Sequence, residues 1–423
     1  MPRAPVCEAP ERPSARAAAL RALPATAFYL ALAGLILWLL PERAWAVKPA
    51  GLIGLGLFGA WRYAWQLLHV ARHWRYRRTV FPALRRAAEE AAPPHPRRVY
   101  FMVTSYHEHP GVSEAVFRSI VQEASNIESR VVVVVSVGGE REMRRITDVV
   151  QAEPGGEALQ LVFMRQEHGK RVAMGHALRA ISRHANAPEN WHEDAENDIV
   201  VFMDGDAMLQ PGALARCLPF FRMNPRLGAA VTDNLGLALE CESLFQDWYD
   251  LKFAQRNHLF HSHSLSRRVL TLTGRFAVYP ARVVLTADFI RFLESDHMDH
   301  WLFGRIRFLM GDDKSTWFYL LRRGWEMLYV PDASVVALET RQTRFVRTSI
   351  GLMRRWYGNM LRTNQRAVKL GPRPMGRFIW WCILDQRFTT WTPLVGPVCT
   401  LLLTLFASPF YLGFYCSWVL LTR

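Results

Sequence analysis

Residues 199–206 read Ile-Val-Val-Phe-Met-Asp-Gly-Asp, an apolar run followed at once by two acidic residues. The run has the composition of a buried β-strand. Two carboxylates separated by one residue at the end of a strand can bind Mg²⁺ or Mn²⁺, and such an ion can hold a diphosphate. We therefore interpret Asp204 and Asp206 as metal ligands. The plainer alternative is a pair of exposed turn residues.

Strand and helix patterns alternate in the residues that lead to this stretch. We expect strands over 98–103, 131–137, 159–164 and 199–203, and helices over 113–123 and 172–184. This alternation favours an open α/β sheet with mainly parallel strands. Ligands of such sheets bind beyond the carboxyl ends of the strands, so we expect the chemistry at residues 104–108, 136–140 and 204–206.

A second acidic pair, Asp312 and Asp313, stands in Gly311-Asp-Asp-Lys314 after an apolar run. One of these carboxylates can serve as a general base toward a hydroxyl group. Acidic residues are also favoured at the start of a helix, where they cap backbone N–H groups and face the positive end of the dipole. The two interpretations are compatible.

Two basic motifs are weaker candidates. Arg354-Arg-Trp-Tyr357 can hold phosphate oxygens through its guanidinium groups and offer an indole ring to a sugar. The same residues fit a basic aromatic helix lying at a membrane surface. Gly169-Lys170-Arg171 suits a nucleotide phosphate in a loop before a helix, but it lacks the GxxxxGK[ST] pattern and also fits a solvated basic loop.

Charge and hydrophobicity are unevenly distributed. Lys and Arg total 52 against 37 Asp and Glu, for a formal charge of +15, and half of the residues are hydrophobic. Arginines concentrate between residues 71 and 98, directly after an apolar span, which favours a membrane protein with basic cytoplasmic flanks over a nucleic-acid binder. The six cysteines form no CxxC pair, so neither a zinc site nor a disulfide framework is indicated.

The apolar segments define the expected organisation. Residues 23–40 are uncharged, and a second apolar segment from about 46 to 70 follows a short break at 41–45, so the two predict a transmembrane hairpin. The full division is a cytoplasmic tail (1–22), the hairpin (23–70), a basic cytoplasmic linker (71–96), an α/β domain (97–344), an amphipathic interfacial segment (345–388) and a C-terminal transmembrane region (389–423), broken near 407–409.

Taken in order, these motifs resemble the processive family 2 glycosyltransferases, which place a cytoplasmic GT-A domain between membrane helices. The shared elements are the DxD pair, the acidic base motif and a QxxRW-like motif over 352–356. Within that family the chain is most similar to the catalytic subunits of bacterial alginate synthases. This likeness is strongest at residues 253–256, 268–275, 308–315, 329–333, 355–359 and 385–387.

The resemblance implies roles for the residues. Asp204 and Asp206 would hold Mg²⁺ or Mn²⁺ on the donor diphosphate, and Asp313, beside Asp312, would take the proton of the acceptor hydroxyl. Further roles follow: Lys170, Glu108 and Arg355 for the donor nucleotide or diphosphate, and Trp356, Arg275 and Gly274 for the acceptor. An anionic sugar also needs a cation, and Lys252, Arg256 and Arg275 are all candidates.

Three departures from the family pattern bear on the substrate. Leu352 replaces the Gln of QxxRW, which removes a hydrogen bond. The residues Val135-Ser-Val-Gly-Gly-Glu140 lack the Asp that contacts uracil in relatives, which fits a guanosine donor. The chain also stops at its last apolar segment, where similar synthases continue, and we expect a shorter export path or an inactive product.

The expected product is a β-1,4-linked polymannuronate made from GDP-mannuronate, with alternatives in a β-glycan synthase that uses a UDP-sugar and a non-catalytic membrane scaffold. The resemblance implies a multi-pass protein of the bacterial inner membrane that handles a growing polysaccharide. It also implies a companion subunit whose PilZ domain senses cyclic-di-GMP. Nucleic acid is not an expected partner.

Overall fold

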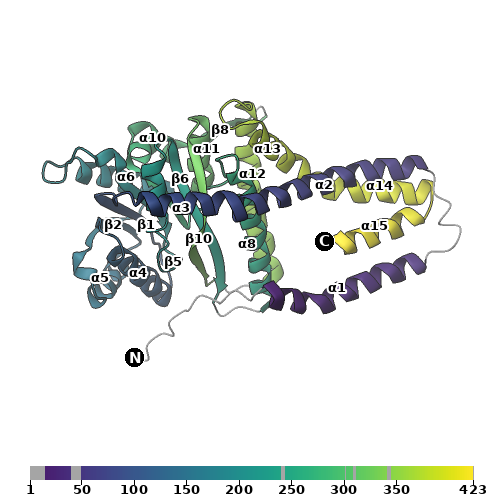
Figure 1. Ribbon diagram of the computed structural model, residues 1–423, viewed down its shortest axis with the longest axis horizontal. Helices are drawn as coiled ribbons and strands as arrows, with labels where there is room; N and C mark the ends of the chain where they lie inside the picture. The colour runs from purple at the N-terminus through teal and green to yellow at the C-terminus, as the bar shows by residue number, and fades with distance from the viewer. Residues whose placement is uncertain are drawn as a thin grey trace. The chain divides into compact units, whose positions relative to one another are not determined.

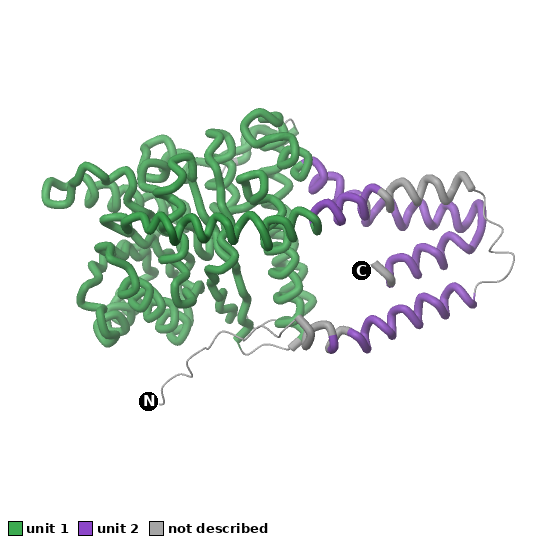
Figure 2. The backbone as a smooth tube through the Cα atoms, viewed as in Figure 1, with its two compact units in different colours: residues 1–9, 70–383 green, residues 10–69, 384–423 purple. Residues whose placement is uncertain are grey.

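The computed structural model describes residues 15–39, 49–239, 243–300, 302–307, 311–340 and 344–422. The chain forms two compact units: a sheet unit built around residues 70–383, and a helical unit from residues 10–69 and 384–423 (Figure 2). Several sequence predictions concern residues outside the described ranges: the break at 41–45, most of the N-terminal tail, and residues 308–310 before the acidic pair.

The sheet unit alternates strands and helices (Figure 1). Its strands are β1 (Arg98–Thr104), β2 (Arg130–Val137), β3 (Gln160–Arg165), β4 (Ile199–Asp204), β5 (Ala207–Leu209), β6 (Leu227–Ala238), β7 (Phe276–Pro280), β8 (His297–His300), β9 (Gly304–Arg307) and β10 (Glu326–Glu339). Its helices are α3 (Phe81–Ala91), α4 (Pro110–Ser125), α5 (Glu140–Ala152), α6 (Lys170–Ala185), α7 (Leu218–Met223), α8 (Ser243–Ser264), α9 (Ala281–Val284), α10 (Ala287–Ser295), α11 (Asp312–Arg322) and α12 (Phe345–Lys369). The strands and helices predicted before residue 204 are confirmed, with ends that differ by a few residues.

The main sheet has the strand order β3-β2-β1-β4-β7-β6-β10-β5. Strands β3, β2, β1 and β4 are parallel, as predicted, whereas β7 is antiparallel to β4 and β6, and β5 to β10. Because crossovers between parallel strands are right-handed, the reversal of direction after β3 places α4 and α5 on one face and α6 on the other (Figure 1). The reversal leaves a switch point between β1 and β4.

The core of the sheet unit comes from its apolar strands. Residues 99–103 of β1 are each exposed by 1% or less, and residues 199–203 of β4 are also buried. Strands covered on both faces take continuous apolar sequences rather than alternating ones, as the runs in β1, β2 and β4 do. Burial of each large side chain stabilises the fold by about 1.5–3 kcal/mol, which holds the strand ends in fixed positions.

The basic segment before β1 is helical and belongs to the sheet unit. Helix α2 (Pro49–Arg75) continues into a π-helical turn (Tyr76–Val80) and then α3. The fully buried Tyr76 donates its hydroxyl hydrogen to the carbonyl oxygen of Tyr329 at 2.7 Å, and Arg85 pairs with Asp332 at 2.8 Å. Both contacts anchor this segment on β10, at and beside the irregular register between Val330 and Ser334.

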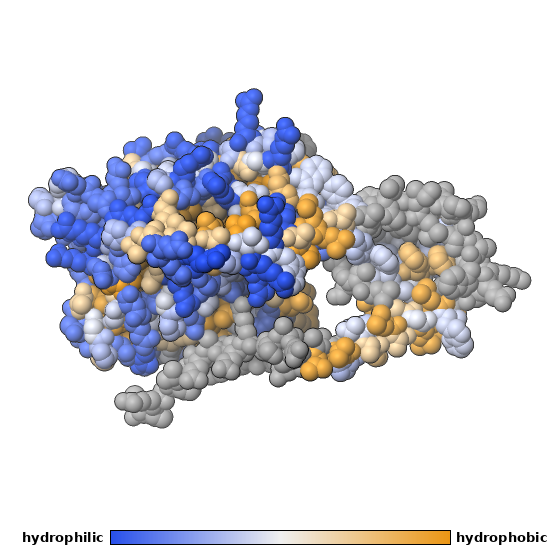
Figure 3. All heavy atoms as spheres, viewed as in Figure 1, coloured by the Kyte–Doolittle hydropathy of each residue, from blue (hydrophilic) through white to orange (hydrophobic). Residues whose placement is uncertain are grey.

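The helical unit contains α1 (Ala15–Trp38), most of α2, the end of α13 (Arg377–Thr389), α14 (Thr392–Phe406) and α15 (Phe410–Thr422). Inside it Arg62 pairs with Asp385 at 3.0 Å, and the Ser417 hydroxyl donates to the Ala33 carbonyl oxygen. The predicted break at 407–409 is confirmed between α14 and α15. Apolar side chains gather along α1, whereas the visible face of the sheet unit is mostly hydrophilic (Figure 3).

Within the described ranges no single helix is both long enough and apolar enough to cross a bilayer alone. One bent pair, Arg377–Thr389 with Pro393–Phe406, meets the requirement by length and composition.

Candidate active site

The site lies at the switch point of the sheet. Thr104 at the end of β1 is in register with Asp204 at the end of β4, so both side chains emerge at the same edge. The Gly205 amide donates to the Thr104 carbonyl oxygen at 2.8 Å, and a Cβ at residue 205 would come within 2.8 Å of the Ser105 backbone. The glycine between the two aspartates therefore lets the chain turn closely against β1.

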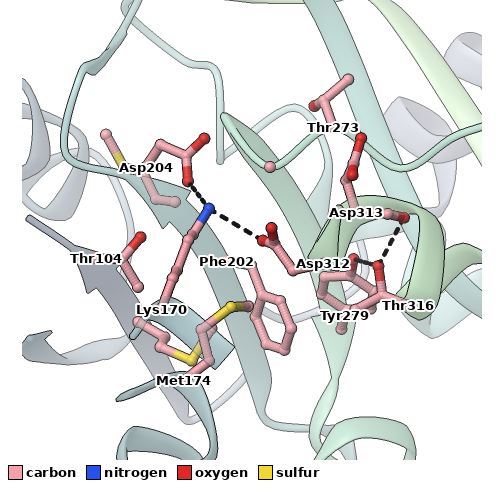
Figure 4. Close-up of a pocket in the computed structure, with 13 residues that line it drawn as sticks. Thr104, Lys170, Met174, Phe202, Asp204, Thr273, Tyr279, Asp312, Asp313 and Thr316 are labelled. Atoms are coloured by element: carbon pink, nitrogen blue, oxygen red, sulfur yellow. Dashed lines mark hydrogen bonds and ion pairs between the residues drawn. The ribbon is translucent and has the colours of Figure 1, made fainter. Parts of the chain in front are cut away.

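Lys170 joins the two acidic motifs. Its ammonium group lies 2.6 Å from Asp204 Oδ1 and 3.0 Å from Asp312 Oδ2 (Figure 4). Lys170 is the first residue of α6, and Asp312 is the first residue of α11. The prediction of a loop at Lys170 was wrong, because Gly169, with φ of 84°, ends the preceding loop and the helix begins immediately. One cation thus connects the end of β4 with the start of α11.

The two carboxylates of the second motif are in different electrostatic states. Burial opposes ionisation of Asp312, but its ion pair with Lys170 dominates and lowers the pKa of Asp312. Burial and then repulsion by Asp312 raise the pKa of Asp313. Burial alone would lower the pKa of Lys170, yet the charges of Asp204 and Asp312 raise it. Asp312 is thus held as a charged partner of Lys170, while Asp313 has the higher proton affinity that suits a general base.

The loop before β7 closes the site. β7 runs antiparallel to β4 and pairs Phe276 with Met203, so the residues that enter β7 lie beside the end of β4. A Cβ at Gly274 would lie 3.0 Å from Asp204 Oδ2, and the Thr271 hydroxyl lies 3.5 Å from Asp313 Oδ2. Residues from β1, β4, β7, α6, α11 and this loop together line one pocket: Met102, Thr104, Lys170, Met174, Phe202, Met203, Asp204, Thr273, Gly274, Tyr279, Asp312, Asp313 and Thr316 (Figure 4).

The carboxylates of the first motif fit a divalent cation. Asp206 Oδ1 is buried and accepts no hydrogen bond from any described residue. Burial and then repulsion by Asp204 raise the pKa of Asp206 to about 6. A buried carboxylate oxygen without a donor, next to a second carboxylate, matches the oxygen ligands that Mg²⁺ and Mn²⁺ prefer. Asp204 and Asp206 are therefore the residues that can hold such an ion.

Other predicted site residues lie outside the set that lines this pocket in the described part of the chain. Glu108 is half-buried in the loop after β1, where its carbonyl oxygen faces Arg145. Arg355 is exposed on α12. Trp356 stacks on Trp248 with ring centroids 6.0 Å apart, and the Lys252 ammonium lies 2.7 Å from the centre of its ring. Their roles toward donor and acceptor stay predictions.

Leu352 has a packing role. It is 4% exposed and belongs to a core cluster with Phe245, Tyr249 and Phe253 of α8, against which Trp356 also packs. An amide at this position would meet aromatic rings rather than a phosphate. The apolar surroundings of position 352 therefore fit the Leu found here better than the Gln of the family motif.

The residues that hold α11 in place were not predicted from the sequence. Asp296, 2% exposed, pairs with Arg366 of α12 at 2.8 Å. Arg171 donates to the Ser315 hydroxyl and to the Leu293 carbonyl oxygen, both at 2.8 Å. These contacts join α6, α10, α11 and α12 around the acidic pair. The pairs are far apart in the sequence and follow no motif, so no local signal could have found them.

Comparisons with known proteins identify the family. The profile described as "Glycosyltransferase like family 2" matches residues 95–359, which include both acidic motifs and the Arg-Trp pair. The chain belongs to glycosyltransferase family 2. As a family 2 glycosyltransferase it is an enzyme that transfers a sugar from a donor to an acceptor.

Two relatives extend the likeness beyond the family 2 domain. The glycosyltransferase alg8 of Pseudomonas syringae pv. tomato is 34% identical over 404 residues, which cover 94% of this chain and 79% of the relative. The glycosyltransferase alg8 of Azotobacter vinelandii is 37% identical over 376 residues, or 87% of this chain and 74% of the relative. The similarity to these family 2 enzymes thus includes segments of the helical unit.

Proposed function

We propose that this family 2 glycosyltransferase is an inverting, processive enzyme that polymerises mannuronic acid from GDP-mannuronate into a β-1,4-linked alginate precursor. The observation that carries the proposal is the meeting of Asp204, Lys170, Asp312 and Asp313 in one pocket. The likeness to two enzymes named glycosyltransferase alg8 agrees with the resemblance to alginate synthases and supports the same uronate substrate.

The residues of the pocket have different roles in a single displacement reaction. Asp313 accepts the proton of the acceptor 4-hydroxyl as the oxygen forms a bond to the anomeric carbon of the donor. The bond from that carbon to the diphosphate breaks on the opposite side, so an α-linked donor yields a β-linked product. Lys170 supplies positive charge beside Asp204, where the diphosphate leaves. Asp312 holds Lys170 in that position.

The metal belongs to the same proposal. Asp204 and Asp206 would hold Mg²⁺ or Mn²⁺, and such an ion supplies positive charge to the diphosphate of the leaving GDP when it is bound. Arg355 and Glu108 remain candidates for the donor, and Trp356, Gly274 and Arg275 for the acceptor.

We also place the enzyme in the bacterial inner membrane, with its sheet unit in the cytoplasm. The support comes from the sequence: the uncharged residues 23–40, the apolar C-terminal region and the arginines between 71 and 98. A companion subunit with a PilZ domain would provide control by cyclic-di-GMP, and the polymer would leave through the membrane segments.

Sugar incorporation tests the donor. Membranes that contain the full chain, with and without the companion subunit, are supplied with labelled GDP-mannuronate or with UDP-sugars. Polymer from GDP-mannuronate alone, made only when Mg²⁺ or Mn²⁺ is present, is the expected result. Polymer from a UDP-sugar would retain the reaction class and overturn the substrate. No polymer from any donor, with the companion present, would overturn the polymerase assignment.

A further inference from the structure

Three basic side chains surround one buried ring beside the acidic pocket. The ring of Phe253, on α8, is 2% exposed. Its centroid lies 4.7 Å from Arg256 Cζ, 5.1 Å from Arg275 Cζ and 5.2 Å from Lys252 Nζ. We call Lys252, Arg256 and Arg275 the cation cluster. Their charges converge although they come from different elements, since Lys252 and Arg256 belong to α8 and Arg275 precedes β7.

Within the part of the chain that the structure describes, no residue of the cation cluster forms an ion pair with an acidic side chain. Arg256 Nε and Nη2 and Arg275 Nε are buried and donate no hydrogen bond there. Two acidic groups whose charges act on the cluster accept hydrogen bonds from other residues: Glu339 from Tyr249 at 2.9 Å and Asp233 from Tyr329 at 3.2 Å. Like charges gathered in a buried place without hydrogen bonds destabilise a fold. Ring contacts offset only part of this cost.

The position of the cluster indicates which ligand could pair with its charges. Arg275 directly follows Gly274, whose Cβ would lie 3.0 Å from Asp204 Oδ2, so the cluster adjoins the pocket that contains Asp204 and Asp313. The sugar whose hydroxyl faces Asp313 is the end of the acceptor chain. Burial, and then repulsion by Arg275, Arg256 and Arg355, lowers the pKa of Lys252 to about 5, so this side chain would gain a proton when an anion arrives.

We propose that the cation cluster binds carboxylate groups of a polyanionic acceptor chain next to its growing end. Arg256 and Arg275 supply N–H donors to the carboxylate oxygens, and Lys252 supplies charge from the surface of Trp356. The cluster thereby makes the site selective for uronate chains over neutral β-glucans. This inference rests on the proposed function and names its acceptor subsite.

The test measures binding without turnover. The full chain, in detergent or lipid nanodiscs, is titrated with a β-1,4-linked mannuronate hexamer, with cellohexaose as the neutral probe and with GDP. The variants are Arg256→Met and Lys252→Met, which keep the apolar stems and remove the charges. Arg144→Met is the matched control, because Arg144 is an exposed arginine of α5.

Each cluster variant should raise the Kd of the mannuronate hexamer at least tenfold, which corresponds to about 1.4 kcal/mol. The Kd values of GDP and cellohexaose should stay within about twofold, which is near experimental error on that scale. The Tm of the ligand-free variants should stay the same or rise, because Arg256→Met removes an unpaired buried charge and Lys252→Met removes a buried amine. Arg144→Met should change none of these values.

Two results would overturn the inference. One is unchanged hexamer affinity in both cluster variants, while the wild-type enzyme still makes polymer from GDP-mannuronate. The other is a lower Tm with equal losses of GDP and hexamer binding, which marks the cations as structural. A wild-type enzyme that binds cellohexaose, ignores the mannuronate hexamer and uses a UDP-sugar would instead overturn the proposed function.

Discussion

Asp313 is the proposed general base of the transfer reaction. It is adjacent to Asp312, yet only Asp312 pairs with Lys170, and the pKa of Asp313 is raised by burial and by repulsion from Asp312. Of two neighbouring carboxylates, one is therefore held ionised by a cation and the other is available to accept a proton. Three predictions follow from individual residues of this pocket.

The variant Asp313→Asn should lose transfer by about a hundredfold to ten-thousandfold, because the amide cannot accept the proton. Binding of GDP should change little, since Asp204 and Lys170 stay in place. Initial rates of sugar incorporation and GDP affinity check this together. Asp148→Asn, at an exposed position of α5, is the control and should keep wild-type activity. Polymerisation at the normal rate by Asp313→Asn would remove this residue from the mechanism.

Activity should be lost on acidification at a higher pH than for an ordinary aspartate, whose pKa is about 3.9. The base works when deprotonated, and the pKa of Asp313 is raised, so the rate is full above that pKa and falls as pH decreases through it. Asp206, with a pKa raised to about 6 by burial and by Asp204, also protonates on acidification. Measuring kcat against pH at increasing Mg²⁺ separates the two, because metal competes with protons only at Asp206. A rate loss that high Mg²⁺ abolishes completely would contradict the role of Asp313.

Gly274→Ala should weaken the response to metal. The added Cβ would lie 3.0 Å from Asp204 Oδ2, so the carboxylate or the loop must shift. We expect a rise of several-fold in the Mg²⁺ concentration needed for half-maximal activity, since a loss of about 1 kcal/mol in ligand geometry is roughly fivefold in affinity. The control is Gly139→Ala, because a Cβ there meets no atom within 4 Å. If both variants need the same Mg²⁺ concentration for half-maximal activity, the loop shifts to accommodate the added methyl group and the prediction is wrong.

The positions of the four acidic residues in the two motifs could be predicted because their signals are local. Asp204 and Asp206 follow a recognisable strand, and Asp312 and Asp313 stand where a helix begins. The contacts of Lys170 could not be predicted, since they depend on the strand order that brings α6 beside β4 and α11. The sequence indicated Lys252, Arg256 and Arg275 only as three separate candidates. Their common contact with the Phe253 ring depends on the fold and could not be predicted.

At the scale of elements, α8 and α12 show how a pattern predicts a helix without predicting its partner. The sequence indicates an amphipathic segment after residue 344, and α12 is helical over Phe345–Lys369. Its buried side, which includes Leu352, packs on Phe245, Tyr249 and Phe253 of α8. Apolar periodicity identifies the buried face but carries no information on which helix will cover it.

Leu352→Gln, which restores the residue of the family motif, should therefore destabilise the enzyme rather than improve it. A buried amide without partners costs about 1–3 kcal/mol, which lowers Tm by several degrees. Leu352→Met, similar in volume and apolar, is the control and should cost less than about 1.5 kcal/mol. Thermal unfolding monitored by tryptophan fluorescence gives both values. A Gln variant with unchanged Tm and a lower donor KM would show that the motif contact can form here.

At the scale of the whole molecule, the helical unit has a surface unlike that of the sheet unit. Large apolar side chains are exposed on its helices: Trp38 by 79%, Leu405 by 67% and Phe406 by 84%. Side chains of this kind require either lipid or another protein surface. The sequence predicted where these segments lie and where the last one breaks, because long uncharged runs stand out in any context. Their pairing, such as α1 with α15, needed the structure.

Thiol labelling tests the membrane placement. Cys399 is exposed on α14, and we expect lipid to shield it, so a variant that keeps only this cysteine should react with an apolar maleimide and resist a charged one. In a cysteine-free background, Asp148→Cys is the control: the charged reagent should label it in inside-out vesicles and spare it in right-side-out vesicles. Labelling of Cys399 by the charged reagent from either side would contradict the predicted C-terminal span.

The antiparallel pairing of β7 with β4 has an evolutionary consequence. It fixes the start of β7 next to Asp204, so Gly274 stays beside the predicted metal ligand whatever side chain stands at position 275. Asp204 ends a buried strand, whereas residue 275 belongs to the loop that leads into the neighbouring strand. A synthase lineage could thus change the proposed sugar contact at residue 275 without disturbing the backbone beside the predicted metal ligand.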